Sequence, residues 1–570
     1  MRPTGQRTKK GDSGTGYKSA RTLLLRIVPY VIVAVLSYSY LHLYKYYLPS
    51  PTEDEGMFPY RAYQILNGKV LYKDIGAILF PGNYYFLAFI YKMFGYSFAV
   101  TRELVLSIDV VSSLLIYRLS SIIIKRWFAV LPPLLFLVYG FPAVFGYSHY
   151  VNSMTMLFVA LIFLYTYLEG RSTLSLCCSG VFVGLTTLFL QSKGVIAFAV
   201  FVFVLFMDDK GRYRGSRGTD GTGGGGTAEE GQGRDRDPQK AAPLSGLRAT
   251  GYFAISAAAV VAVAFSYIAV KGALLDFVQN ELVAARIYKG LTSFSLDMLS
   301  KGFISIWTKE SLIRVLWFGG SGILGLYLLL FKKESTPEQA ILFAGGAVLF
   351  LNTGQRLIFN PIGLVLINSS FAVILSVWLL VLLLDYLRPR LWALIYRGTE
   401  RVVDSVAVVV IILACVWLYD GVRHVQRDAY HFTVNGVRLW TFNKQMGEGL
   451  SDFSMRAARI MGIDRTALIY PYSPILYTLL DLNSPAKYDV LIKVGNDRGT
   501  PDSVLLDVIR RLKDIPVKFI ITYDWGPNVF QTVSRSLGMG YVPNVLDNFI
   551  IEHYRPVLMI DGFMLMRLQQ

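Results

Sequence analysis

The residues best suited to chemistry form an acidic trio soon after the first long apolar run of the chain. Glu53, Asp54 and Glu55 stand together there, and Arg61 follows them. When a carboxylate at a membrane surface faces a partly apolar groove, desolvation can raise its pKa, and the carboxylate can then serve as a general base. A nearby cation favours an anionic ligand such as a phosphate. The pattern predicts acid–base chemistry on a phosphate-bearing substrate; the alternative is a solvated acidic flank.

Further polar residues lie at the ends of apolar runs that, by the topology given below, face the same side as Asp54. They are Arg102, His149, Asn152, Lys193, Arg356 and Asn360. Each of them alone is compatible with a side chain that snorkels to the membrane interface. Their convergence on one membrane face predicts an anion-binding site. His149 does not predict a zinc site, because no second His or Cys stands near it at ligand spacing.

The composition places these residues in a membrane protein. The chain has 570 residues, of which 54% are hydrophobic and 17% charged, whereas a soluble domain carries about 25% charged residues. The net charge of +17 is interpreted as cytoplasmic loop charge and not as a nucleic-acid surface. Cys177, Cys178 and Cys415 all lie in apolar runs, which argues against a disulfide framework or a thiolate zinc site.

We predict a polytopic α-helical membrane protein with about eleven spans. The candidate runs are 22–42, 98–120, 128–146, 151–168, 174–190, 194–207, 249–270, 312–331, 338–353, 361–384 and 402–420. The segment 80–94 is apolar but short, and it opens with Pro81-Gly82. If it does not cross the membrane, the inside loops hold 24 Lys/Arg and the outside loops 12. The positive-inside rule favours this arrangement, so we predict an interfacial helix over 80–94.

This topology divides the chain into five regions. They are a cytoplasmic basic N-terminus over 1–21, a membrane module over 22–207 with a catalytic outer loop at 43–97, a flexible Gly-rich cytoplasmic linker over 208–248, further spans over 249–420, and an extracytoplasmic domain over 421–570. Short apolar runs at Ala467–Tyr470, Val517–Tyr523 and Phe549–Glu552, which are typical of strands, alternate with helical patterns at 503–514 and 527–538. We therefore predict a small α/β domain at the C-terminal end.

With these residues in place, the chain resembles the GT-C superfamily of integral-membrane glycosyltransferases, of the aminoarabinose transferase and protein O-mannosyltransferase type. The resemblance covers nearly the whole chain outside the linker. It rests on Asp54-Glu55, Gly68 with Tyr72, Pro81 to Phe94-Gly95, Arg102, Gly184-Leu185, Lys193-Gly194, Arg356 to Pro361, YPYSPILY at 470–477, Asn483-Ser484-Pro485, and Phe549 to Tyr554. Phe80-Pro81 replaces the family's double proline, Phe58 a tyrosine, and Asn152 a later acidic residue.

The resemblance implies an inverting glycosyltransferase at the outer face of a cell membrane. It would move a monosaccharide from a polyprenyl phosphate to a hydroxyl of a lipid, glycan or protein. Asp54 is expected to be the base, with Glu55 assisting. Arg102, Lys193 and Arg356 are the expected phosphate clamp, and Tyr84 and Tyr85 are expected to line the sugar pocket or to anchor the interface. Arg61, His149, Asn152 and Asn360 are expected to contact the substrate. A lipid-phosphate leaving group requires no metal cofactor, although a divalent metal is compatible with the family.

Three other functions fit parts of the sequence. A transporter or flippase of lipid-linked sugars would carry its ionisable residues near the middle of the membrane. A polysaccharide polymerase or ligase would use a diphosphate-linked donor and is expected to have a large loop late among its spans. A non-catalytic assembly partner with the same fold would be favoured by loss of the Asp54-Glu55 pair, which is present.

Overall fold

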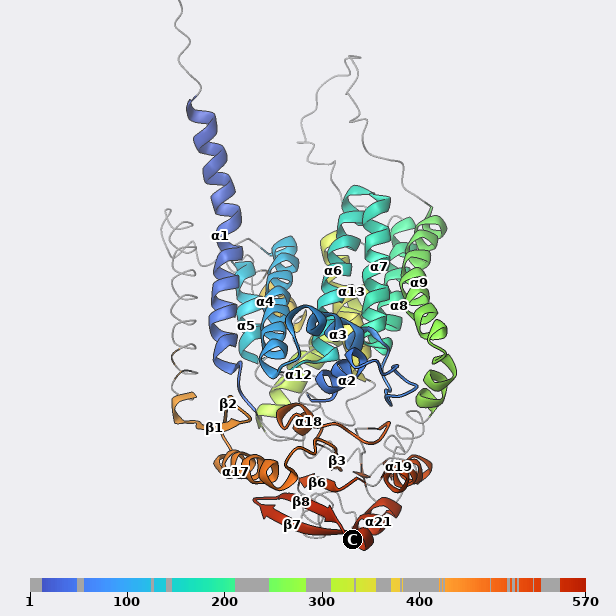
Figure 1. Ribbon diagram of the computed structural model, residues 1–570. Coiled ribbons are helices and arrows are strands. Elements are labelled where there is room, and N and C mark those ends of the chain that lie inside the picture. The colour runs from blue at the N-terminus through green and yellow to red at the C-terminus, as the bar shows by residue number, and fades with distance from the viewer. Residues whose placement is uncertain are drawn as a thin grey trace, which may run out of the picture.

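The structure is a computed structural model of the chain. It describes residues 13–48, 56–124, 128–139, 146–210, 245–282, 309–332, 335–354, 371–379, 382, 420, 423, 426–471, 473–488, 493–494, 498–499, 502–515, 517–523 and 544–569. These residues form a helical bundle and, at one end of it, a smaller domain that contains a sheet (Figure 1).

The bundle is built from long apolar helices. They are α1 (Ser13–Tyr44), α4 (Phe98–Ile123), α5 (Leu131–Tyr139) with its preceding 3-10 turn η2 (Phe128–Val130), α6 (His149–Gly170), α7 (Thr173–Phe189), α8 (Gln191–Asp209), α9 (Gly246–Val270), α12 (Lys309–Phe331) and α13 (Pro337–Gly354). In the described part of the chain, five of these helices are long and apolar enough to cross a bilayer: α1, α4, α6, α8 and α9. The run 402–420 lies almost wholly, and 361–384 in part, outside the described residues, so the total of eleven spans stays a prediction.

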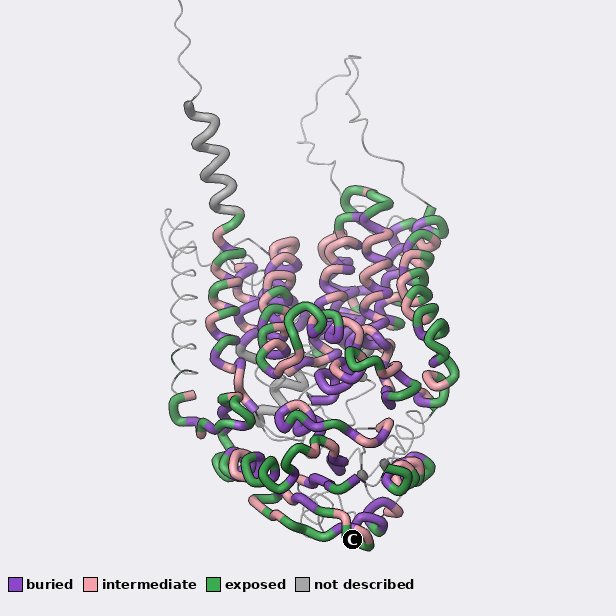
Figure 2. The backbone as a smooth tube through the Cα atoms, viewed as in Figure 1, coloured by how far each residue is buried: buried purple, intermediate pink, exposed green. Residues whose placement is uncertain are grey.

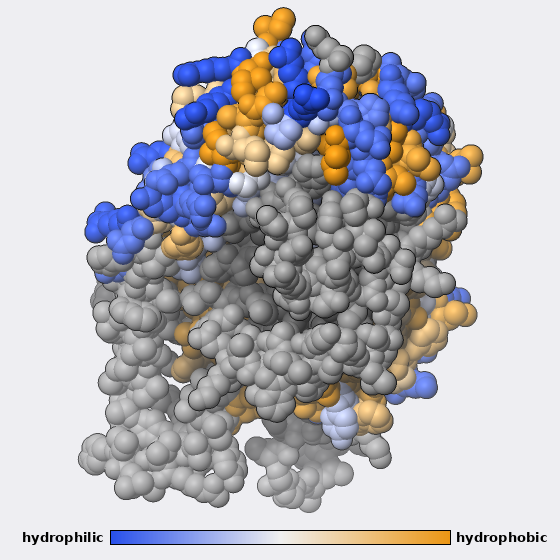
Figure 3. Space-filling view, turned by 90° about the horizontal axis from the view of Figure 1, so that it is seen from below, coloured by the Kyte–Doolittle hydropathy of each residue, from blue (hydrophilic) through white to orange (hydrophobic). Residues whose placement is uncertain are grey.

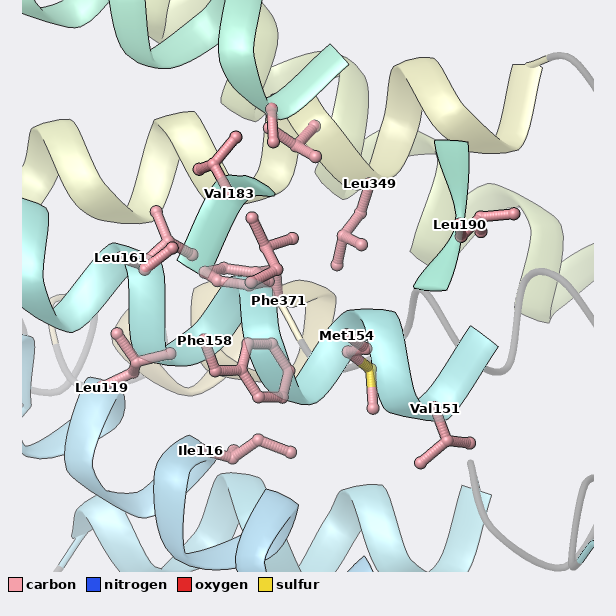
Figure 4. Packing of buried hydrophobic residues seen from close by; sticks show 14 of the residues in the cluster. Ile116, Leu119, Val151, Met154, Phe158, Leu161, Val183, Leu190, Leu349 and Phe371 are labelled. Carbon is pink, nitrogen blue, oxygen red and sulfur yellow. The ribbon is translucent and has the colours of Figure 1, made fainter. Parts of the chain in front are cut away.

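The centre of the bundle is packed with branched and aromatic side chains. Figure 4 shows Leu161 and Phe158 of α6 facing side chains of α4, α7 and the segment 371–379. The rings of Phe158 and Phe371 lie 5.7 Å apart. Figure 2 shows that the helices present exposed residues on the outside of the bundle, among them Val263 of α9. This burial pattern is typical of a membrane bundle whose outer face contacts lipid.

Two glycines allow α7 and α9 to approach closely. A Cβ atom on Gly180 would lie 2.4 Å from the carbonyl oxygen of Phe253, and one on Gly184 would lie 2.6 Å from that of Ala257. Small residues at such contacts are how membrane helices gain van der Waals packing. The Gly184-Leu185 element that carries the family resemblance therefore lies at a helix–helix contact.

We expect Gly184→Ala to lower thermal stability in detergent, because the methyl group would push α7 away from α9. Overpacking of this kind costs about 1–3 kcal/mol. Gly251→Ala is the matched control, since a Cβ atom at Gly251 meets nothing within 4 Å; there the exchange should be neutral or stabilising by about 0.5–1 kcal/mol. Equal melting temperatures for the two variants would contradict the close contact.

Two short helices, α2 (Met57–Leu66) and α3 (Gly82–Phe94), lie at the end of the bundle that faces the C-terminal domain (Figure 1). One side of α3 is buried, including Tyr84 and Tyr91, whereas Phe89 and Met93 are exposed. Its 13 residues measure about 20 Å at 1.5 Å each, which is less than the ~30 Å hydrocarbon core. That 80–94 stays in the interface remains a prediction.

The C-terminal domain contains a four-stranded sheet with helices on both faces. Its elements are β1 (Tyr430–Val434), β2 (Val437–Thr441), α17 (Lys444–Met461), β3 (Ala467–Tyr470), α18 (Ile475–Leu479), β4 (Lys493–Val494), β5 (Arg498–Gly499), α19 (Asp502–Asp514), β6 (Phe519–Tyr523), α21 (Val545–His553), β7 (Tyr554–Ile560) and β8 (Phe563–Leu568). The sheet order is β3-β6-β8-β7, with β3 and β6 parallel and the other pairs antiparallel.

The alternation of side chains along the strands explains the two helical layers. Ile469 and Ile521 belong to the same hydrophobic cluster as Phe453 of α17. Leu468 and Ile520 belong to another cluster with residues of α19 and α21. Seen from the side of this domain, hydrophilic side chains cover much of the coloured surface, with smaller hydrophobic patches between them (Figure 3). The predicted small α/β domain is present.

The strand predicted from the sequence at Phe549–Glu552 is wrong, because these residues are helical. This run lies in α21, which begins at Asn544: the Asn544 side chain accepts hydrogen bonds from the backbone N–H groups of Leu546 and Asp547, and the Asp547 carboxylate accepts one from the Asn544 N–H. This reciprocal capping starts a helix. The true strands of this region, β7 and β8, follow it. The helical pattern predicted at 527–538 lies outside the described residues.

Candidate active site at the ends of α2, α3, α6 and α8

Four elements bring cations, aromatic rings and amides together at the end of the bundle next to the C-terminal domain. We call this set the cation–aromatic cluster; its members are Phe58, Arg61, Asn83, Tyr84, Tyr147, His149, Asn152 and Lys193. Helix α2 supplies Phe58 and Arg61, and α3 supplies Asn83 and Tyr84. Tyr147 lies just before α6, His149 and Asn152 lie in its first turn, and Lys193 lies in the first turn of α8. Five residues that the sequence predicted as substrate-binding therefore lie in one place.

Arg61 forms one side of the cluster. It is 3% exposed, its Nη1 donates to the Tyr84 hydroxyl at 3.3 Å, and its guanidinium lies 5.9 Å from the centre of that ring. The Phe58 ring packs against the rings of Tyr84, at 5.4 Å, and His149, at 5.6 Å. A guanidinium stays protonated in proteins, so this side of the cluster is cationic.

Hydrogen bonds from two side-chain amides, those of Asn83 and Asn152, fix α3 against α6 and α7. The Asn152 Nδ2 donates to the Asn83 Oδ1 at 2.9 Å, and the Asn83 Nδ2 donates to the Phe189 carbonyl oxygen at 2.7 Å. The Tyr147 hydroxyl donates to the Asn83 carbonyl oxygen at 3.1 Å. The close approach of α3 to the end of α7 requires a glycine at position 82, since a Cβ atom there would lie 2.7 Å from the Leu188 carbonyl oxygen. Asn152, predicted as a substrate contact, thus uses its amide to hold α3.

Lys193 is the most buried cation of the cluster, at 0% exposure. Its Nζ donates to the Tyr150 carbonyl oxygen at 3.1 Å, and the His149 and Tyr150 rings lie 3.9 Å apart. Leu190 alone separates α7 from α8, and a Cβ atom on Gly194 would meet Thr187 at 2.1 Å, so this turn fixes the lysine. An ammonium has three N–H donors, and the described residues supply no acceptor for the other two.

Arg102 and Tyr85 make their described contacts elsewhere. The Arg102 Nη2 donates to the Tyr47 carbonyl oxygen at 2.8 Å, and its guanidinium lies 4.8 Å from the Phe98 ring centre. It therefore binds the chain just beyond α1. The Tyr85 ring lies 5.4 Å from that of Tyr267 in α9, edge to face. Tyr85 follows Tyr84 by one residue. At 3.6 residues per turn, its side chain therefore lies on a different side of α3 from that of Tyr84.

Four predicted residues lie outside the described part of the chain: Asp54, Glu55, Arg356 and Asn360. The flanks of the acidic pair are described, with Leu48 on one side and Gly56 on the other. The roles assigned to these four residues stay predictions.

Glu281 is a candidate functional residue that was not predicted from the sequence. It lies in the short helix over 274–282 that follows α9, and its Oε1 makes no hydrogen bond to the described residues. The neighbouring Asn280 donates from Nδ2 to the Tyr72 carbonyl oxygen at 3.1 Å. Burial raises the pKa of Glu281 to about 7. Burial, with Tyr84 and then Glu281, also holds the pKa of Tyr72 well above its ordinary value. The available signal was a pair of acids, Asp276 and Glu281, in the otherwise largely apolar segment LLDFVQNELV.

We expect Glu281→Gln to stabilise the protein relative to wild type increasingly as the pH rises from about 4.5 to 7. The folded state raises the pKa of this carboxyl from 4.5 to about 7, so it binds the proton more tightly than the unfolded state. Wild-type stability therefore falls as pH rises from about 4.5 to 7. The variant lacks this loss, and its melting temperature relative to wild type should increase between pH 5 and pH 8. A constant difference across that range would contradict the buried carboxyl.

Comparison with known structures decides the fold. The chain is similar to ArnT from Cupriavidus metallidurans bound to undecaprenyl phosphate, with a TM-score of 0.51, 11% identity, and coverage of 95% of this chain and 98% of that one. It is also similar to the Archaeoglobus fulgidus oligosaccharyltransferase tethered with an acceptor peptide, with a TM-score of 0.50, 12% identity, and coverage of 96% and 74%. The chain has the GT-C fold. No protein-family model and no curated protein matches the sequence.

The cation–aromatic cluster lies where α2 and α3 meet the starts of α6 and α8, at the same end of the bundle as the C-terminal domain (Figure 1). The identities of 11% and 12% show the fold alone. The reaction must be argued from the cluster itself.

Proposed function

We propose that this protein is an inverting glycosyltransferase that moves a monosaccharide from a polyprenyl phosphate to a hydroxyl of a lipid, glycan or protein. The reaction takes place at the outer face of the plasma membrane, with the N-terminus and the 208–248 linker inside and the C-terminal domain outside. The partition of 24 inside and 12 outside Lys/Arg supports this orientation.

One observation carries the proposal: two buried cations share one cluster at the end of the bundle. From Arg61, the rings of Tyr84, Phe58, His149 and Tyr150 pack one against the next. Lys193 joins these contacts through the backbone carbonyl oxygen of Tyr150. Both cations carry several N–H donors, and charge-assisted hydrogen bonds to an anionic ligand are the strong ones. A phosphate fits, because positioned cations stabilise its developing charge when the sugar leaves.

The position of the cluster supports a lipid-linked donor. It lies beside α3, whose exposed Phe89 and Met93 suit the membrane interface. The undecaprenyl phosphate named with the Cupriavidus metallidurans ArnT is a carrier of the proposed class. Tyr84 and His149 would line the sugar side of the site, and Arg356 and Asn360 would complete it. Arg102 joins the clamp in the family pattern, but its described bond to Tyr47 favours a positioning role.

Asp54 is proposed as the general base. The acceptor oxygen attacks C1 of the sugar and its proton passes to Asp54, while the bond from C1 to the phosphate oxygen breaks. The polyprenyl phosphate leaves with that bonding pair, and Lys193 and Arg61 balance its charge. Attack from the face opposite the leaving group inverts the anomeric carbon. Glu55 assists by orienting the acceptor. The balance requires no other reactant.

A second candidate, transport of lipid-linked sugars, is favoured by Asp109. This residue is 1% exposed in the middle of α4, and its Oδ2 has no hydrogen-bond partner among the described residues. An ionisable group inside a membrane span is often part of a transport path. The two candidates differ in the fate of the phosphate bond, which transfer breaks and transport leaves intact.

Mass spectrometry of surface glycans from a deletion strain would test the proposal. We expect the strain to lack one sugar residue on an envelope glycan, lipid or protein and to accumulate a polyprenyl-phosphate sugar at the outer leaflet. The wild-type gene should restore the residue, and a gene carrying Asp54→Asn should not. Accumulation of the donor at the inner leaflet would favour transport instead.

A further inference from the structure

The C-terminal domain contains a pocket of its own. It is a cavity of about 410 Å³ between strand β1, helix α17 and the chain that follows α18. This volume lies within the range of small-molecule sites, about 300–1,000 Å³. The lining residues that the structure describes all belong to this domain, and none of them is a member of the cation–aromatic cluster. The pocket is therefore a second candidate site in the chain.

One side of the pocket is apolar. Leu480 and Leu482 are 8% and 4% exposed, and they pack in the same hydrophobic core as Met461, at the end of α17. Met455, on the same helix, also lines the pocket and is half exposed. Methionine side chains adapt to the shape of a ligand because they are unbranched and flexible. This side of the pocket suits the C–H groups of a ligand.

Another part of the lining is polar. Arg465 lines the pocket with Thr433 and Asn435, and all three residues are exposed. The Ser451 hydroxyl, from α17, donates to the Thr433 carbonyl oxygen at 2.9 Å, so α17 holds this end of β1 in place. A guanidinium binds a carboxylate or a phosphate through parallel N–H donors, and amide and hydroxyl groups both donate to and accept from sugar hydroxyls. The polar side of the pocket thus fits an anionic group flanked by hydroxyls.

The pocket is connected to the cation–aromatic cluster through α2. Asn483 directly follows the apolar side of the pocket in the chain, and its Oδ1 accepts a hydrogen bond from the Gln64 Nε2 of α2 at 3.2 Å. At the start of α2, a Cβ atom on Gly56 would lie 2.0 Å from the backbone N of Ile475, so only glycine allows this contact with α18. Arg61 of the cluster lies between these two contacts. A chain molecule bound in the pocket would therefore lie on the domain that packs against the donor site.

We propose that this pocket binds an acidic sugar unit of the acceptor, with Arg465 on its carboxylate or phosphate group and the apolar side chains under its ring. The inference rests on the proposed function, whose acceptor it narrows to a glycan chain with acidic units. Such a chain occupies the pocket with one unit while another presents its hydroxyl for transfer. Binding in the pocket raises the effective concentration of that hydroxyl at the site. The pocket takes no part in the chemistry of transfer.

Isothermal titration calorimetry with the full-length protein in nanodiscs tests the binding. Three probes are compared: trigalacturonate, which carries carboxylates, mannose 6-phosphate, which carries a phosphate, and uncharged maltotriose. We expect one acidic probe to bind about tenfold or more tightly than maltotriose, because charge-assisted hydrogen bonds are the strong ones. Arg465→Gln should weaken the binding of that probe by on the order of 10- to 100-fold, as for loss of a hydrogen bond to a charged group.

Two further variants separate the pocket from the rest of the domain. Ala458→Trp fills the pocket with an indole ring while it keeps Arg465, and it should abolish probe binding. Arg510→Gln is the matched control. Arg510 is an exposed arginine of α19, which packs on the other face of the sheet, so its loss should leave probe binding within about twofold of wild type.

The transfer assay relates the pocket to the reaction. Arg465→Gln should raise the acceptor KM by about tenfold and leave kcat and the donor KM within about twofold, because the pocket lies outside the site of chemistry. Acidic probes that bind wild type and Arg465→Gln equally, or no better than maltotriose, would overturn the assignment of the pocket. An unchanged acceptor KM in Arg465→Gln would overturn its link to the acceptor. Probe binding through Arg465 in a protein that transfers no sugar would count against the proposed function alone.

Discussion

Asp54→Asn is expected to lower the turnover of sugar transfer by on the order of 10²–10⁴-fold, the usual contribution of one general base. Asparagine keeps the size of aspartate but cannot take the proton from the acceptor hydroxyl. Donor binding and thermal stability should therefore stay close to wild type. The measurement is the initial rate of transfer in detergent or proteoliposomes, with variants of matched melting temperature.

The neighbouring acids are the controls for this experiment. Glu53→Gln should be mild, because Glu53 lies outside the Asp54-Glu55 element, and Glu55→Gln should fall between the two. If the trio is only a solvated flank, all three variants will show small and similar effects. That result would leave the glycosyltransferase proposal without its base.

Lys193→Met is expected to give the largest loss on the donor side. Methionine keeps the apolar stem of the side chain and removes the ammonium from the cation–aromatic cluster. Losing one partner of a buried charged contact costs roughly 2–5 kcal/mol, here in kcat/KM for the donor. The measurement is the transfer rate as a function of donor concentration at saturating acceptor.

Lys210→Met is the matched control for Lys193→Met. Lys210 caps the other end of the same helix, α8, and is exposed, so its loss should change kcat/KM by less than twofold. Arg61→Gln should resemble Lys193→Met, because Arg61 supplies the second buried cation. Equal effects of the Lys193 and Lys210 variants would show that the buried ammonium has no special role at the donor.

Much of the bundle was predictable because hydropathy and loop charge constrain membrane helices strongly. The run 98–120 corresponds to α4, and 151–168 to α6. Arg61, His149, Asn152 and Lys193 lie together at one end of the bundle, and the substrate contacts predicted for them stay predictions. What these side chains bind there depends on partners far away in sequence. The bonds from Arg102 to Tyr47 and from Asn152 to Asn83 could not be read from spacing.

The C-terminal domain was harder to predict, because a four-residue apolar run carries no period that separates a strand from a helix. Ala467–Tyr470 is a strand, β3, whereas Phe549–Glu552 lies in a helix. The Asn544 and Asp547 capping pair was the local signal that would have distinguished them. The contact of Gly56 with Ile475 joins residues more than 400 positions apart, and no local pattern announces it.

The most direct test of the central claim is transfer from a defined donor in proteoliposomes. Purified protein would receive a synthetic polyprenyl-phosphate sugar and an acceptor glycan extract, and both products would be followed by mass spectrometry and NMR. We predict release of polyprenyl monophosphate, formation of a glycoside with the anomeric configuration opposite to that of the donor, and loss of both in Asp54→Asn. An intact donor that moves between leaflets without release of polyprenyl phosphate would contradict the account.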